Sequence, residues 1–233
     1  MRLIFWLAVW LMVLAASLVG PVHAQEQAVY VVTYVEVMPS AVAGGTVLLR
    51  RYRDTSRKQD GNARSSVLQE IGRPNRFAIV EEWNSQAAFD AHAKAPATSQ
   101  FHEKLKSLVD APSDERVTHL LYAAATKGFA RSGAIRSTAV YVVTHVDVIP
   151  PGKDDCMAAL KAMSVDTAND PGNLAYQVLQ QTNRSNHFTA LETWSSQSAR
   201  DAHAMAAHTE SFREKLTPFA GALYDERLYK ALN

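Results

Sequence analysis

The sequence contains one unit written twice. The segment Val29–Thr33 (VYVVT) recurs as Val140–Thr144, which sets an offset of 111 residues within the 233-residue chain. The offset holds without a gap to the end of the chain, and about a third of the roughly 95 aligned positions are identical. A repeat of this size is a small domain. We therefore expect domains at residues 28–122 and 139–233.

The segment between the repeats, residues 123–138, is rich in Ala, Gly and Ser and shows no apolar periodicity. We interpret it as a linker. A linker of this length reaches about 50 Å when extended, so it does not dictate how the two domains pair.

The amino terminus resembles a secretory signal peptide. Arg2 gives a positive start, an apolar run covers Leu3–Val19, and small residues precede Gln25. We expect residues 1–24 to be removed after Ala24 and the protein to be periplasmic or secreted. The alternative is an uncleaved anchor, because the apolar run is near the lower limit for spanning a bilayer. Contact with a membrane is expected only in that case.

The charge balance excludes a large class of partners. With 24 basic and 23 acidic side chains, the formal charge is +1, and a nucleic-acid binder needs a basic surface.

Cys156 is the single cysteine, so the chain has no internal disulfide framework and no thiolate-rich metal site. We find no glycine-rich phosphate loop, nucleophile elbow or zinc signature.

Each repeat has the pattern β-α-β-β-α-β, with helical spacing of Met157, Leu160 and Met163 in the second copy. Asn62 and Asn173 are expected in left-handed turns. The pattern predicts an α+β, ferredoxin-like fold with helices on one face of an antiparallel sheet. For the second repeat the expected strands are 140–148, 174–181, 187–194 and 227–232, with a hairpin at 183–186, a helix capped by Ser195 or Ser196, and a helical stretch at 209–216.

The second repeat carries a motif that extends from Pro171-Gly172-Asn173-x-x-Tyr176 through Phe188-x-x-x-Glu192-x-Trp194 to His203, His208 and Phe212. This pattern resembles the antibiotic biosynthesis monooxygenase family of dimeric α+β-barrel proteins, and the likeness covers nearly all of each repeat. The family includes cofactor-independent oxygenases of quinols and polyketide phenols, haem-degrading enzymes and a signal-molecule isomerase. Because its members normally form homodimers, the resemblance implies that domain 1 pairs with domain 2 in an intramolecular pseudo-dimer.

The two repeats do not carry the same residues at these positions. Ser65 stands in the first repeat where the second has Tyr176, and Ala97 stands where the second has His208. The first repeat keeps Glu81, Trp83 and His92. We therefore expect the second pocket to be the active one and the first to be degenerate.

Glu192 and Trp194 alternate with Thr193, so they share one face of a strand with Phe188. An aromatic ring there can stack on a planar substrate, and Trp194, Glu192 and Phe188 are the expected substrate-binding residues. Trp83 and His92 are added from the first repeat. The alternatives are a core-filling role for Trp194 and, for Glu192, a structural hydrogen bond or ion pair to a helix or linker.

His203, His208 and Tyr176 are the expected catalytic residues. Histidine is the natural base near neutral pH; it would remove a phenolic proton, and the phenolate would then transfer an electron to O₂. Tyr176 would position either the substrate oxygen or the oxygenated intermediate. The spacing of five between the histidines does not favour chelation by that pair alone, and no metal ligand is expected, although a break in the helix could bring both to one cavity. The alternative for His203 is a packing or capping role.

The sequence thus predicts an exported monooxygenase that acts on a small quinol or polyphenol, with O₂ as co-substrate and no cofactor. The alternative is a non-catalytic module that binds a hydrophobic small molecule or haem. Haem is not expected, because the haem-degrading relatives carry an asparagine on the first strand and none occurs in 30–37 or 141–148.

Overall fold

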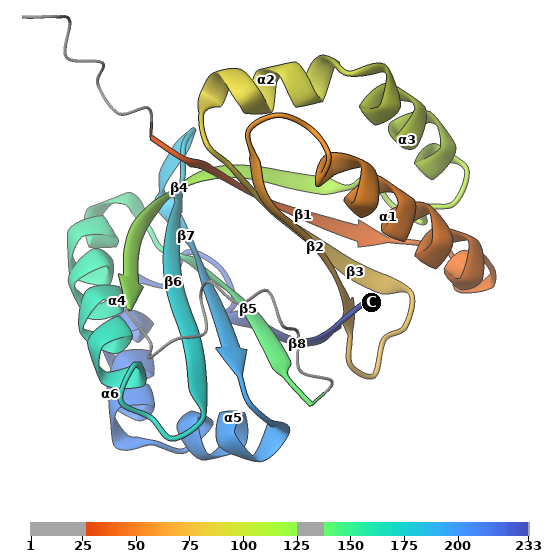
Figure 1. Ribbon diagram of the computed structural model, residues 1–233. Helices are drawn as coiled ribbons and strands as arrows, with labels where there is room; N and C mark the ends of the chain where they lie inside the picture. Colours follow the sequence, from red (N-terminus) through yellow and green to blue (C-terminus); the bar gives the residue numbers. More distant parts are fainter. Residues whose placement is uncertain (1–26, 125–137, 233) are drawn as a thin grey trace, which may run out of the picture.

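A computed structural model describes residues 27–124 and 138–232 (Figure 1). The predicted signal peptide and residues 125–137 of the predicted linker lie outside the described residues. In the described part of the chain, no helix is both long and apolar enough to cross a membrane.

Eight strands form one closed barrel, in the order β1-β3-β2-β8-β5-β7-β6-β4. All neighbouring strands are antiparallel. The strands are β1 (Val29–Glu36), β2 (Asn62–Glu70), β3 (Arg76–Trp83), β4 (Asp114–Ala124), β5 (Val140–Asp147), β6 (Asn173–Gln181), β7 (Arg184–Trp194) and β8 (Asp225–Ala231).

The helices lie outside the barrel, with those of each repeat on the sheet of the same repeat (Figure 1). In the first repeat they are α1 (Val42–Ser56), α2 (Gln86–Lys94) and α3 (Pro96–Lys106). In the second they are α4 (Lys153–Thr167), α5 (Gln197–Ala204) and α6 (Ala207–Leu216). Short 3₁₀ turns occur at η1 (Pro39–Ala41), η2 (Pro150–Gly152) and η3 (Thr217–Phe219). The predicted α+β order of each repeat is confirmed.

The two repeats close the barrel through two junctions, β4 with β6 and β2 with β8. A separate four-stranded sheet would leave these edges unpaired. One apolar cluster fills the barrel and includes Tyr30 and Val80 from the first repeat together with Val143, Leu191 and Tyr229 from the second. The expected intramolecular pseudo-dimer is therefore confirmed, and neither repeat encloses this core alone.

Equivalent residues of the two repeats meet inside the barrel. Tyr34 and His145 differ by the repeat offset, and their ring centroids lie 4.8 Å apart. The guanidinium of Arg116 donates to Nδ1 of His145 at 2.9 Å, and burial lowers the pKa of His145 to about 4.

Three local expectations differ from the structure. Strand β7 begins at Arg184, so the β6–β7 hairpin has a two-residue loop and the expected loop at 183–186 was wrong. Strand β4 continues through Ala124, because it pairs with β6 inside the range expected for the linker. Asn62 and Asn173 are not left-handed; the preceding Gly61 and Gly172 take positive φ values of 79° and 86°.

Candidate functional site

Each repeat buries a Trp, a Glu and a His between its sheet and its helices. The tryptophans Trp83 and Trp194 are completely buried at the ends of β3 and β7. The ring of His92 on α2 lies 4.4 Å from that of Trp83, and the ring of His203 on α5 lies 4.7 Å from that of Trp194. Because the repeats fold alike, these two histidines define equivalent sites.

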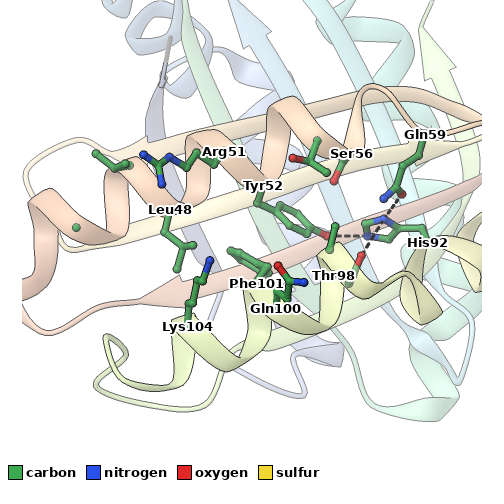
Figure 2. A pocket seen from close by; sticks show the side chains of 14 residues that line it. Leu48, Arg51, Tyr52, Ser56, Gln59, His92, Thr98, Gln100, Phe101 and Lys104 are labelled. Atoms are coloured by element: carbon green, nitrogen blue, oxygen red, sulfur yellow. Dashed lines mark hydrogen bonds between the residues drawn. The ribbon is translucent and has the colours of Figure 1, made fainter.

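In the first repeat, Tyr52 reaches the histidine from α1 (Figure 2). Its hydroxyl lies 2.8 Å from Nε2 of His92 and 3.1 Å from Oε2 of Glu81. Phe101 on α3 stacks on the Tyr52 ring with centroids 4.0 Å apart, which fixes the direction of the hydroxyl. A phenol, an imidazole and a carboxylate therefore converge on one point.

The tautomer of His92 follows from its other neighbour. Oε1 of Gln59 lies 2.6 Å from Nδ1 of His92. An amide oxygen only accepts, so Nδ1 carries the proton and Nε2 has a lone pair. The single proton of the Tyr52 hydroxyl is therefore shared between two acceptors, Nε2 of His92 and Oε2 of Glu81. Burial lowers the pKa of His92 to about 4, which keeps the imidazole neutral at physiological pH. Burial also raises the pKa of Glu81 and of Tyr52 above their usual ranges.

A cavity of about 260 Å³ opens beside this group, between α1 and α3 (Figure 2). His92, Tyr52 and Phe101 line it, together with two cations, Arg51 and Lys104. The cavity thus combines a proton acceptor, aromatic walls and positive charge. Among the predicted site residues, His92 is the one that lines it.

The second repeat builds its site differently. The helix break at Met205–Ala206 lets His208 on α6 approach His203 on α5, with ring centroids 5.3 Å apart. Both imidazoles contact the same oxygen, Oδ2 of Asp170, at 2.6 Å from Nδ1 of His203 and 3.1 Å from Nε2 of His208. The two predicted catalytic histidines are therefore brought together.

The carboxylate of Glu192 accepts a hydrogen bond from its own strand, not from the helix or linker that the structural alternative named. The indole Nε1 of Trp194 donates to Oε2 of Glu192 at 2.7 Å. Burial raises the pKa of Glu192 to about 7, and the indole hydrogen bond opposes that rise. Nε2 of His203 lies 3.9 Å from the same oxygen.

The remaining second-repeat candidates lie in the core. Tyr176 and Phe188 are at most 2% exposed and pack in the cluster beneath α4 and α6. Burial, followed by Glu192, raises the pKa of Tyr176 well above its usual value. Trp194 and His208 do not stack on each other; the ring of His203 contacts both. The catalytic and substrate-binding roles of these residues stay predictions.

Three residues of the sites were not predicted. Tyr52 aligns with Met163, so the motif of the second repeat has no tyrosine at this position. The sequence indicated only that Tyr52 lies on the same helix face as Leu49 and Ser56, three and four residues away. Gln59 and Asp170 occupy equivalent positions two residues before a glycine. Both residues contact the histidine of their own site.

Comparisons with known proteins agree with this architecture. The family described as Antibiotic biosynthesis monooxygenase matches residues 28–104 and again 139–215. YcnE of Bacillus subtilis (strain 168), which is named as a monooxygenase, is 34% identical over 65 residues, 28% of this chain and 68% of YcnE.

Two solved structures share the fold along the whole barrel. A Fusobacterium nucleatum protein, also named as a monooxygenase, superposes with a TM-score of 0.76 at 16% identity, over 89% of this chain and 94% of its own. An anthrone oxidase-like protein gives 0.70 at 14% identity, over 90% and 93% of the two chains. With two matches to the family in one chain, this protein belongs to the antibiotic biosynthesis monooxygenase family and carries its domain twice.

Proposed function

We propose that the protein is an exported, cofactor-independent monooxygenase that oxidises a small quinol or polyphenol. The observation that carries the proposal is the cavity of about 260 Å³ next to His92 and Tyr52. Its volume and aromatic lining suit one or two fused rings, and family membership supports the oxygenase activity.

The first step is removal of a phenolic proton. The Tyr52 hydroxyl lies within hydrogen-bond distance of His92, and both residues line the cavity. The substrate hydroxyl gives its proton to the Tyr52 oxygen as Tyr52 passes its own to Nε2 of His92. Gln59 holds the ring in the accepting tautomer. The side chains of Arg51 and Lys104 favour the phenolate that forms.

The phenolate then reduces O₂. Written for a substrate RH₂, the reaction is RH₂ + O₂ → RO + H₂O. The substrate supplies four electrons, one oxygen atom enters the product, and the other leaves as water with both protons. No external reductant is needed, and the residues supply positioning and proton transfer.

An oxygen electrode tests this proposal with a panel of quinols and polyphenols of one or two fused rings. The equivalent histidines of the two repeats provide one matched pair of variants, His92→Ala and His203→Ala. Tyr52→Phe is compared with Tyr176→Phe, which alters a tyrosine buried in the core of the second repeat. We expect O₂ uptake by the wild type and a loss of about 10²-fold or more in kcat/KM for His92→Ala and Tyr52→Phe.

The remaining outcomes separate the alternatives. Losses confined to His203→Ala, His208→Ala and Tyr176→Phe would place the reaction in the second repeat. If no substrate raises O₂ uptake and native mass spectrometry finds a retained ligand, the protein is a binding module and the oxygenase proposal fails. Fractionation of the native host, with amino-terminal sequencing, tests export and cleavage after Ala24.

A further inference from the structure

The side chains of Asp170, His203 and His208 form a cluster of potential metal ligands in the second repeat. Asp170 comes from the turn after α4, and the histidines come from α5 and α6. Among the described residues, these three ligand-type side chains place one potential donor atom each within 4.8 Å of the others. Nε2 of His208 is buried without a hydrogen-bond partner in the described structure, despite its 3.1 Å approach to Asp170.

The first repeat shows what the same place looks like without this cluster. There, Oε1 of Gln59 satisfies Nδ1 of His92 at 2.6 Å, and Ala97 occupies the position of His208. In the first repeat, uncharged groups therefore orient the histidine: the amide of Gln59 at Nδ1 and the hydroxyl of Tyr52 at Nε2. The second repeat has instead a carboxylate and an additional imidazole.

We propose that Asp170, His203 and His208 bind a divalent first-row transition metal ion, such as Zn²⁺ or Co²⁺. Two imidazole nitrogens and a carboxylate oxygen are ligands that these ions accept. Tetrahedral bonds of about 2.0–2.2 Å place neighbouring ligand atoms roughly 3.3–3.6 Å apart. The carboxylate oxygen and the imidazole nitrogens lie 2.6 and 3.1 Å apart here, and all three ligand atoms lie within 4.8 Å of one another, so side-chain adjustments of about 1 Å would admit the ion.

The surroundings support an ion at this position. The side chains of Asp170 and His208 are 18% and 21% exposed, so an ion and its water ligands can enter from solvent. The opposite ring nitrogen of His203 faces Oε2 of Glu192 at 3.9 Å and Oγ1 of Thr209 at 3.5 Å. When a histidine binds a metal through one ring nitrogen, its other ring nitrogen commonly donates a hydrogen bond to an acceptor of this kind.

The ion would join three segments that are separate in sequence: the α4–β6 turn, α5 and α6. Its binding free energy would be added to the stability of the folded state. This inference does not depend on the proposed oxygenase reaction, which uses the cavity of the first repeat.

The test is a titration of chelator-treated wild-type protein with Co²⁺ and Zn²⁺. Co²⁺ is followed by its visible absorption, Zn²⁺ by displacement of bound Co²⁺, and both by the shift in Tm. His208→Ala and Asp170→Gln introduce the residues that the first repeat already has at these positions. His187→Ala is the matched control, because Nδ1 of His187 lies 3.1 Å from Asp147 and its side chain is also 21% exposed.

We expect one ion per wild-type chain and a Tm that rises with ion concentration. We expect His208→Ala and Asp170→Gln each to weaken binding by at least about 100-fold, while His187→Ala binds as the wild type does. The proposal is overturned if the wild type binds no stoichiometric ion. It is also overturned if the two ligand variants, shown to be folded by circular dichroism, bind as tightly as the control.

Discussion

Tyr34 and His145 occupy equivalent positions of the two repeats and lie ring against ring inside the barrel, with centroids 4.8 Å apart. In a symmetric homodimer this place would hold two copies of one residue. The fused chain can place two different residues there. One of them, His145, accepts a hydrogen bond from Arg116, a residue of the first repeat.

This contact predicts an acid sensitivity of the fold. The pKa of His145 is about 4 in the folded state because of burial, below the value of 6.5 for a free histidine. Between these values the unfolded state binds more protons, so stability is lost as the pH falls from about 6.5 to 4. The loss is up to roughly 3 kcal/mol. Urea unfolding of His145→Gln should show a smaller decrease over this range than the wild type.

An exposed histidine provides the control for this measurement. His102→Gln on α3 should follow the wild-type profile, because its side chain lies at the surface. If the free energy of unfolding depends on pH in the same way in the wild type and His145→Gln, then His145 is not the source of the acid sensitivity.

The two tryptophans should differ in their contribution to stability. Trp194 donates to Glu192 at 2.7 Å, whereas Nε1 of Trp83 is buried with no hydrogen-bond partner in the described structure. Replacement by Phe removes similar volume at both sites, but at Trp194 it also removes a hydrogen bond to a buried carboxyl group. We expect Trp194→Phe to cost about 1.5–3 kcal/mol more than Trp83→Phe in chemical denaturation. Equal costs would show that the indole hydrogen bond contributes nothing.

The glycine before β6 should tolerate no side chain. Gly172 has φ +86°, and an added Cβ would lie 2.6 Å from Cβ of Ala199 and 2.7 Å from Oγ of Ser195. Gly72 has φ +84° with nothing within 4 Å of such an atom. Gly72→Ala measures backbone strain alone, about 1 kcal/mol. We expect Gly172→Ala to cost at least about 1 kcal/mol more, seen as a lower Tm; a similar cost for both would exclude the steric effect.

The pH profile of the proposed reaction should identify its base. A neutral His92 is required in the free enzyme, and its pKa is about 4. The value of kcat/KM should therefore stay level above about pH 5 and decline as the pH falls through about 4. Circular dichroism over the same range separates this decline from unfolding. A decline centred near the ordinary histidine value would indicate that a base other than buried His92 is used.

Some site residues could be found from sequence because their positions repeat. The offset placed Glu81, Trp83 and His92 opposite Glu192, Trp194 and His203, and the alternation along a strand put each Glu and Trp on one face. Tyr52 and Asp170 could not be found in this way. They reach the histidines from other elements, and the helix periodicity of α1 does not say which residue of α2 it will face.

The sequence by itself determined the duplication, the order of strands and helices in each repeat, and the antiparallel α+β class. These follow from local periodicities and from identity at one offset. The tertiary structure decided which side chains meet: Tyr52 with His92 beside a cavity in the repeat expected to be degenerate, and Asp170 with both His203 and His208. Such contacts join segments far apart in the chain, and their geometry depends on how helices pack on a sheet that is complete only when both repeats close the barrel.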